Sequence, residues 1–261
     1  MKKFIFLMLF LVVSIIVKAQ DEAAELAKKL ANPIANLISV PFQNNTDYGI
    51  GDWDGTRNTL NFQPVIPIGI SKNVNLITRM ILPIVTQYNV TGEGENQNGF
   101  GDVLVSAFFS PINAEKLTWG VGPVLLIPTG TNKYLTTKKF GVGPTAVALK
   151  QVNGWTIGGL INQIWSVAGS EERQDVSQMF FQPFVVFNWK TGAGAGANLE
   201  WTQNWKSGST TLWLNPNLSA VTSLGKQKTQ FVIGPRLNLA APDGGKADWG
   251  WRAVVIFLFP K

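Results

Sequence analysis

Charged side chains are scarce in this chain, at 15% of residues, and five of them lie on the polar faces of runs in which apolar and polar residues alternate. Arg79, Glu200, Arg236 and Arg252 fall near the middle of such runs, and Asp102 falls near the end of another. Arginine pairs with carboxylates through parallel hydrogen bonds and also attracts free anions. These residues therefore predict one of two arrangements. Either they form an ion-pair network that stabilises the protein, or they form a constriction with a positive bias that attracts anionic or polar aromatic solutes. Further candidates to line the same path are Gln182, Asn162, Asn198, Asn217 and Trp213.

The residue types that many enzymes need are missing. The chain has no histidine and no cysteine, which removes Ser-His and Cys-His nucleophiles and imidazole metal sites. It has no phosphate-binding loop, and Gly194–Ala197 lies in a strand-like run rather than in a dinucleotide-binding turn. We therefore expect no catalytic residue, no metal site, no cofactor and no enzymatic activity. The basic residues are scattered, so the formal charge of +6 does not indicate nucleic-acid binding.

The run from Ala193 to Trp205 shows the alternation clearly. Its odd positions are mostly alanine, leucine and tryptophan, whereas its even positions include Asn198, Glu200 and Thr202. Side chains of a β-strand point to opposite faces in turn, so this run has one apolar and one polar face. A soluble barrel would bury the apolar face, whereas a membrane barrel turns it towards lipid and keeps the polar face in a wet lumen.

Twelve such runs predict an all-β protein, a single antiparallel transmembrane β-barrel of about 12 strands. Short links and longer polar loops mostly alternate between the runs, as they do in outer-membrane barrels. An even number of strands returns both ends of the barrel to the short-turn side, which is the periplasmic side. The runs span residues 37–47, 57–70, 74–88, 101–110, 117–128, 141–150, 155–167, 176–189, 193–205, 209–222, 228–240 and 250–259.

The tryptophans fall into two groups along these runs. Three lie near short turns and five lie near long loops, which is typical of the aromatic girdles at two membrane interfaces. The first group is Trp119, Trp155 and Trp189, and the second is Trp53, Trp165, Trp205, Trp249 and Trp251. Prolines at similar heights in several runs, including the repeated Gly120–Pro123 and Gly141–Pro144, predict a ring of weakened strand pairing.

The N-terminal region predicts export. Lys2 and Lys3 precede an apolar stretch and a small-residue cleavage site, so residues 1–19 form a signal peptide. Residues 20–36 then form a leader, and residues 37–261 form the barrel. The leader begins with a short helix over residues 21–31, which lies either at the edge of the barrel or in the lumen as a plug.

The chain resembles the outer-membrane transporter family named for the meta-cleavage pathway of phenol degradation. The residues that carry the resemblance are Leu30–Ala35, Ser39–Asn44, Gln63–Pro67, Phe108–Pro111, Gly120–Pro123 and Ala241–Gly245. The resemblance implies a barrel in the outer membrane that moves small compounds, aromatic ones among them, and it assigns no catalytic or binding residue.

The sequence therefore predicts a passive, porin-like channel or transporter for small molecules in the outer membrane of a Gram-negative cell. Its expected partners are outer-membrane lipid, a small-molecule solute and the barrel-assembly machinery, with no nucleic acid. Two alternatives stay open: a structural or surface-interaction barrel with a closed lumen, and a soluble periplasmic ligand-binding barrel.

Overall fold

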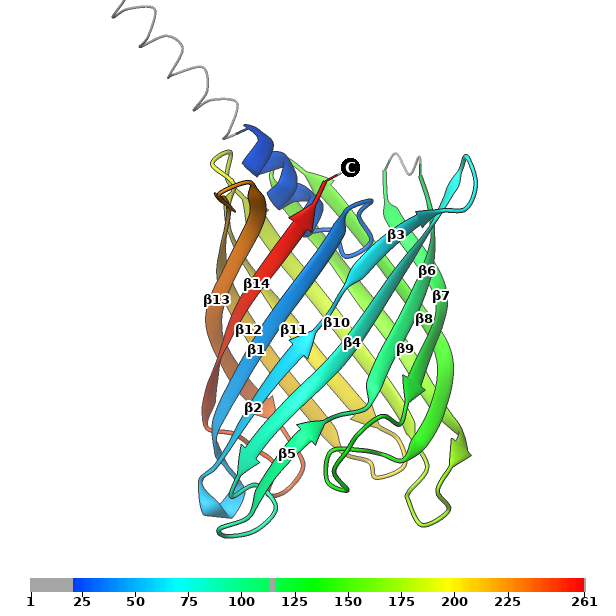
Figure 1. Cartoon of the computed structure of the whole chain (residues 1–261), viewed down its shortest axis with the longest axis vertical. Coiled ribbons are helices and arrows are strands. Elements are labelled where there is room, and N and C mark those ends of the chain that lie inside the picture. The colour runs from blue at the N-terminus through cyan, green and yellow to red at the C-terminus, as the bar shows by residue number, and fades with distance from the viewer. Residues whose placement is uncertain (1–20, 113–115, 261) are drawn as a thin grey trace, which may run out of the picture.

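The strands form one closed antiparallel barrel (Figure 1). The structure is a computed structural model that describes residues 21–112 and 116–260, so the predicted signal peptide lies outside the described residues. Fourteen strands are present in this part of the chain. They are β1 (Ile38–Ile50), β2 (Gly55–Phe62), β3 (Val65–Gly69), β4 (Val74–Tyr88), β5 (Asn96–Phe100), β6 (Val103–Pro111), β7 (Thr118–Ile127), β8 (Lys139–Val152), β9 (Trp155–Gly169), β10 (Ser177–Asn188), β11 (Ala193–Asn204), β12 (Thr210–Leu224), β13 (Gln227–Ala240) and β14 (Trp249–Phe259).

The fourteen strands occupy twelve positions around the wall, here called staves, because two of these positions are each divided between two strands. This confirms the predicted barrel of about 12 strands. β2 and β3 are two parts of one stave that breaks at Gln63 and Pro64, and β5 and β6 are two parts of another that breaks at Gly101 and Asp102. The fourth predicted run therefore begins earlier than expected, because β5 lies in what the sequence indicated as a loop. β14 pairs with β1 from Phe259 to Trp249, and this pairing closes the wall.

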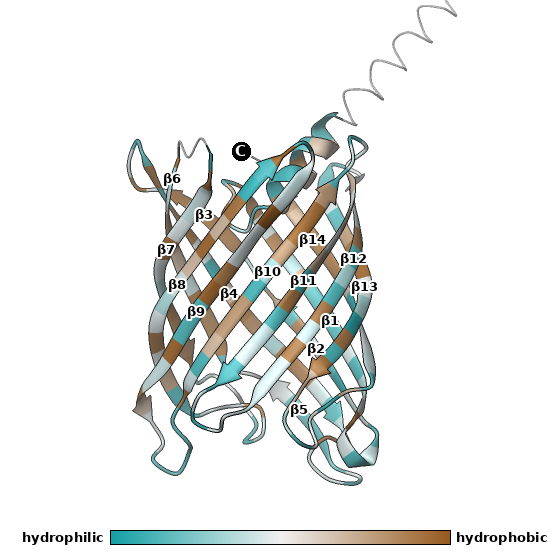
Figure 2. Ribbon diagram, turned by 180° about the vertical axis from the view of Figure 1, so that it is seen from behind, coloured by the Kyte–Doolittle hydropathy of each residue, from teal (hydrophilic) through white to brown (hydrophobic). Residues whose placement is uncertain are grey.

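The outer surface of the barrel carries many exposed apolar side chains, and brown hydrophobic segments alternate with paler and teal ones along the strands in Figure 2. Ile157, Leu218 and Ile233 are each more than half exposed, at 57%, 61% and 61%. Exposure of this much apolar surface to water would be energetically unfavourable for a soluble protein. The alternation predicted from Ala193 to Trp205 holds, since Trp201 faces outward and Glu200 faces the lumen.

Tryptophans surround both rims of this apolar band. Trp119, Trp155 and Trp189 are exposed near the short turns, and Trp165, Trp205 and Trp249 are exposed near the long loops. Neighbouring rings support them: Phe187 contacts both Trp155 and Trp189, and Tyr48 stacks on Trp249 with 4.7 Å between ring centroids. This arrangement is that of two interfacial girdles.

Glycine-proline pairs interrupt the pairing between strands at several points of the wall. The β6–β7 ladder skips residues beside Pro123, and the β8–β9 ladder skips residues beside Pro144. A Cβ atom on Gly122, Gly143 or Gly234 would collide with a carbonyl oxygen of the neighbouring strand. Glycine at these positions therefore allows the close approach of two strands where proline cannot donate a ladder hydrogen bond.

The helix of the leader lies at the edge of the barrel, which is one of the two predicted alternatives, and the segment that enters the lumen is the one that follows the helix. The helix, residues 21–30, lies at the short-turn end of the barrel, where the C-terminal end also lies (Figure 1). Leu26 and Ala27 of the helix are buried against Leu37, Val221 and Leu258. Within the described residues, no helix is long and apolar enough to cross a membrane.

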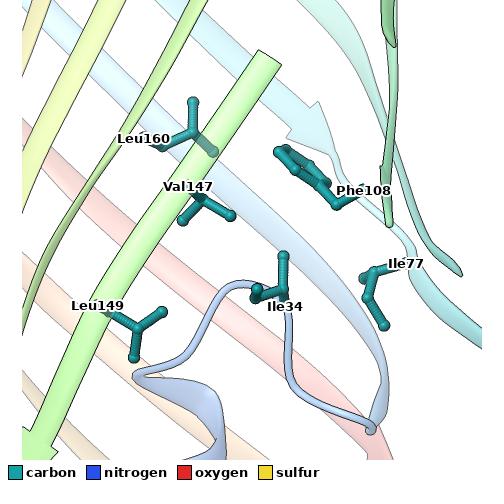
Figure 3. Close-up of a cluster of buried hydrophobic side chains, with 6 residues drawn as sticks. All are labelled: Ile34, Ile77, Phe108, Val147, Leu149 and Leu160. Atoms are coloured by element: carbon teal, nitrogen blue, oxygen red, sulfur yellow. The ribbon is translucent and has the colours of Figure 1, made fainter. Parts of the chain in front are cut away.

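The segment after the helix, residues 31–37, enters the lumen. Ile34 is 4% exposed and packs among five apolar side chains that point inward from four strands (Figure 3). These side chains are Ile77, Phe108, Val147, Leu149 and Leu160. The lumen at the short-turn end is thus filled by a small hydrophobic core in which the leader supplies one member.

Candidate functional site in the barrel lumen

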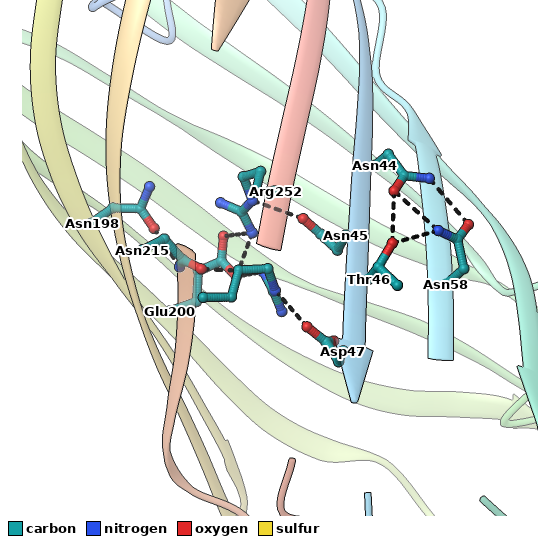
Figure 4. A network of polar contacts seen from close by, with 10 residues as sticks. Asn44, Asn45, Thr46, Asp47, Asn58, Asn198, Glu200, Asn215 and Arg252 are labelled. Carbon is teal, nitrogen blue, oxygen red and sulfur yellow. Dashed lines mark hydrogen bonds and ion pairs between the residues drawn. The ribbon is translucent and has the colours of Figure 1, made fainter. Parts of the chain in front are cut away.

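Four charged side chains form a belt across one side of the lumen. The charged belt consists of Asp47 on β1, Glu200 on β11, Arg236 on β13 and Arg252 on β14 (Figure 4). Arg252 donates to both oxygens of Glu200, at 2.8 and 3.1 Å. Arg236 bridges the two acids, with Nε 2.8 Å from Asp47 and Nη1 3.5 Å from Glu200. Two arginines and two carboxylates therefore neutralise one another in the belt.

Neutral polar groups complete the belt. Arg236 also donates to Asn215, which in turn donates to Asn198 at 3.0 Å, and Arg252 donates to Asn45 at 2.8 Å. The guanidinium of Arg236 lies 4.2 Å from the ring centroid of Trp213, a cation–π geometry. Because each strand alternates its faces, polar residues from five neighbouring staves meet at one height. The belt is a rigid network rather than a set of free charges.

Arg79 on β4 stands apart from the belt. Its Nη2 donates to the side chain of Gln63 at 2.8 Å. Among the described residues, no carboxylate lies within 4.0 Å of its guanidinium, whereas both belt arginines have such partners. Arg79 is therefore a lumen charge without a direct ion pair, and Glu200 attracts it only from a longer distance.

An inner cavity of about 280 Å³ lies between the leader and the charged belt. The leader contributes Leu30, Pro33 and Leu37 to its lining, and the wall contributes Arg79 and Arg252. Of the predicted lining residues, Gln182, Asn198 and Asn217 also reach this cavity. The cavity therefore collects polar groups at one height and apolar groups nearer the leader.

An outer cavity of about 470 Å³ lies nearer the long loops and shares no lining residue with the inner one. Arg57 and Asp102 contribute to its lining, together with residues 134–137 of the loop between β7 and β8. Arg57 donates to Gln87 at 2.8 Å, and Gln87 donates to Gln97 at 2.9 Å. The two cavities therefore lie at different heights of the lumen.

Asp102 fastens the loop of residues 128–138, here called the tethered loop, to the outer end of the barrel. Its carboxylate accepts hydrogen bonds from the backbone of Gly130 and Thr137 and from the hydroxyls of Thr136 and Thr137, at 2.6 to 3.1 Å. Four donors on one carboxylate make a strong attachment. The break in the stave at Asp102 places this side chain beside the loop instead of in the regular pattern of the strand.

A second contact at the same end involves the next long loop. Lys139 lies 2.8 Å from Asp175, and Ser166 donates to the same carboxylate. The hydrogen bond from Lys139 lowers the pKa of Asp175 below its ordinary value, and the hydrogen bond from Ser166 lowers this pKa by a smaller amount. Arg173 donates to two backbone carbonyls of the tethered loop, so the two loops hold each other.

The structure brings together most of the residues that the sequence singled out. Glu200, Arg236, Arg252, Asn198 and Trp213 meet in or beside the belt, as described above, and Gln182 lies 3.4 Å from Glu200. Arg79 and Asp102 lie elsewhere, in the walls of the inner and outer cavities. Asn162 is buried on β9.

Two charged residues of the lumen were missed by the sequence reasoning. Asp47 and Arg57 stand at the ends of predicted runs, at 47 and 57, where no inward charge was assigned. Their parity could have revealed them, because Asp47 follows Gln43 and Asn45 on the inner face of β1. Extending the alternation to the last residue of each run would have found both.

Comparison with solved structures finds this fold in known barrels. An outer membrane channel from Pseudomonas putida F1 matches with a TM-score of 0.65 and 18% identity over 85% of this chain and 94% of that chain. The beta domain of the Bordetella autotransporter BrkA has a TM-score of 0.47 and 12% identity over 86% of this chain and 100% of that one. No family model and no curated protein matches the chain.

The closed wall, the apolar outer face and the two girdles make this protein an outer-membrane β-barrel. A soluble periplasmic barrel, one of the alternatives from the sequence, would leave that outer face in water, and this alternative is wrong. A barrel of twelve strands fits a channel or a transporter. The resemblance to the phenol-degradation family stays a prediction.

Proposed function

We propose that the protein is a gated, passive channel for small molecules, and that the leader is its gate on the short-turn side. One observation carries the proposal: the leader occupies the end of a lumen that otherwise contains two cavities. A barrel whose only role is structural has no need of cavities closed by a separate segment. The channel admits small solutes, aromatic or anionic ones among them. The family resemblance also implies the aromatic solutes, whereas the inward arginines favour the anionic ones.

The leader is held by contacts that can be released without unfolding the wall. The Lys228–Glu22 pair joins the leader to β13 and is partly exposed, and a partly exposed pair of this kind contributes about 0–1 kcal/mol. Burial of the Ile34 side chain contributes about 1.5–3 kcal/mol. The turn after β10 also fits closely against the helix, since a Cβ atom on Gly192 would lie 2.7 Å from the Cβ of Ala23.

Conductance in planar lipid bilayers tests the proposal. We expect low conductance from the intact barrel and several-fold higher conductance from a variant that lacks residues 21–36. Ile34→Asp should have an intermediate effect, because it keeps the leader but places a charge in its apolar seat. Asp21→Asn, at the exposed start of the helix, serves as the control and should conduct like the intact protein.

The same experiment tests the main alternative, a structural or surface-interaction barrel with a closed lumen. The ion pairs of the charged belt favour that alternative, because they narrow the lumen at one height. Absence of channels from both the intact barrel and the leader-deleted barrel would contradict gating and favour the closed barrel. We propose a channel and not an enzyme, and the lack of histidine and cysteine in the chain supports this choice.

A further inference from the structure

The inner cavity has a one-sided charge. Three charged residues contribute to its lining, Lys29, Arg79 and Arg252, and all three are basic. Lys29 pairs with Glu25 and Arg252 pairs with Glu200. Arg79 alone among them has no carboxylate within 4.0 Å in the described part of the chain. The charged groups that line the inner cavity are therefore all basic, and Arg79 is the one among them that forms no direct ion pair.

The donors of Arg79 are available for a ligand. A guanidinium has five N–H donors, and Arg79 makes one hydrogen bond to the described residues, from Nη2 to Gln63. Among the described residues, none of its nitrogen atoms is both fully buried and unpaired, and the residue contributes to the lining of the inner cavity. The planar fork of arginine matches a carboxylate through two parallel hydrogen bonds. A small carboxylate at Arg79 would supply the direct ion pair that the described wall residues do not make with it.

The rest of the inner cavity calls for an apolar body on the same ligand. Apolar side chains line it from both the leader and the wall. They are Leu30, Leu37, Val65, Phe184, Val186, Val232, Val254 and Ile256. A lumen that only conducted hydrated ions would gain nothing from this surface, whereas an apolar group buried against it gains about 25 cal/mol per Å².

The volume limits the size of the ligand. At about 280 Å³, the inner cavity lies just below the range for small-molecule sites, which is about 300–1,000 Å³. One ring or a short chain fits this space, whereas a long acyl chain or an oligosaccharide does not.

We propose that the inner cavity binds small carboxylates with an apolar body, such as aromatic acids or short-chain fatty acids, with the carboxylate on Arg79 and the apolar body against the side chains nearer the leader. The proposal rests on the channel function proposed above and names the solute class that the inner cavity retains.

Calorimetric titration of the intact protein in detergent micelles tests the site. Benzoate and hexanoate are the probes. Benzamide keeps the ring without the charge, and acetate keeps the charge without the body. We expect benzoate and hexanoate to bind at least tenfold more tightly than benzamide and acetate. Equal binding of benzoate and benzamide would overturn the role of the arginine, and equal binding of benzoate and acetate would overturn the role of the apolar wall.

Two arginine variants make the test specific. Arg79→Gln should weaken benzoate binding at least tenfold. Arg57→Gln is the matched control, because Arg57 is also a lumen arginine that donates to a glutamine but lines the outer cavity. Equal loss in both variants, or no loss in Arg79→Gln, would reject the proposed site. If Arg79→Gln does not fold, Arg79→Lys keeps the charge without the fork and should bind benzoate several-fold more weakly than the intact protein; unchanged binding would count against the fork.

The outcomes also separate this inference from the proposed channel. A protein that conducts in bilayers but binds neither benzoate nor hexanoate would remove the site and leave the channel. A protein that binds benzoate through Arg79 but conducts neither with nor without residues 21–36 would leave the site and remove the channel.

Discussion

Replacement of Glu200 by glutamine tests whether the charged belt holds the barrel together. The change keeps the shape of the side chain and removes its charge. Arg252 loses the acceptor of two charge-assisted hydrogen bonds, and Arg236 keeps only Asp47 as a charged partner. Two guanidinium groups, whose side chains are 6% and 7% exposed, are then left with one carboxylate between them.

The expected loss of stability follows from this geometry. Removal of one partner from a buried ion pair costs about 3–5 kcal/mol. The side chain of Glu200 is 19% exposed to the lumen, and glutamine still accepts one hydrogen bond, so we expect Glu200→Gln to lower the free energy of unfolding by about 2–3 kcal/mol. A variant that combines Glu200→Gln with Arg252→Gln should lose less than the sum of the single changes, because the two positions interact.

Unfolding in urea of the barrel embedded in lipid vesicles, followed by tryptophan fluorescence, measures these differences. Glu93→Gln, in an exposed loop, is the control and should change the free energy of unfolding by less than about 0.5 kcal/mol. If Glu200→Gln were no less stable than this control, or if the double variant lost the full sum, the belt would not be a coupled network and the reasoning would be refuted.

Three further predictions concern other parts of the barrel. Asp102→Asn should release the tethered loop, residues 128–138, and speed its cleavage by trypsin about tenfold; an unchanged rate would show that the carboxylate does not hold the loop. Because the pKa of Asp175 is lowered in the folded state, its contact with lysine stabilises the loops above the ordinary aspartate pKa of about 3.9 and is lost as the pH falls through the lowered value. Proteolysis with pepsin should therefore accelerate below about pH 4 when it is measured relative to Asp175→Asn at the same pH, and a constant ratio of the two rates would contradict the role of Asp175. Ile233→Arg, at mid-wall, should destabilise the barrel in vesicles by about 2–4 kcal/mol, whereas Leu239→Arg, near the outer rim, should cost about 0–1 kcal/mol; equal losses would argue against the assigned membrane depth.

The alternation of side chains was sufficient to predict the wall and most of the charged belt. It placed Glu200, Arg236 and Arg252 on the inner face of strands far apart in the sequence, and a closed barrel brings such positions to one height. The same rule, stopped one residue short of the loops, missed Asp47 and Arg57. Both residues stand inside predicted runs, so the prediction was limited by the failure to assign faces at the run ends rather than by the physical rule.

The leader and the tethered loop could not be predicted in the same way. Residues 31–37 have no period that distinguishes an extended linker from a plug, because Ile34 is buried by side chains from distant strands. The hydrogen bonds of Asp102 join residues 28 to 35 positions apart. Such contacts depend on where a loop folds back in space, and the alternation of residues within one strand does not contain this information.

The pairing of β1 with β14 has a consequence for how the wall comes into being. Ile38 lies opposite Phe259, so the ladder that closes the cylinder joins segments more than two hundred residues apart. Closing so long a loop carries a large entropic penalty before any contact rewards it, which makes such folding slow. Until β14 arrives, β1 and β13 each present an unpaired edge that other chains could extend. The unfinished barrel is thus most vulnerable to aggregation just before its last strand joins, and segments at opposite ends of the chain complete the fold in a single step.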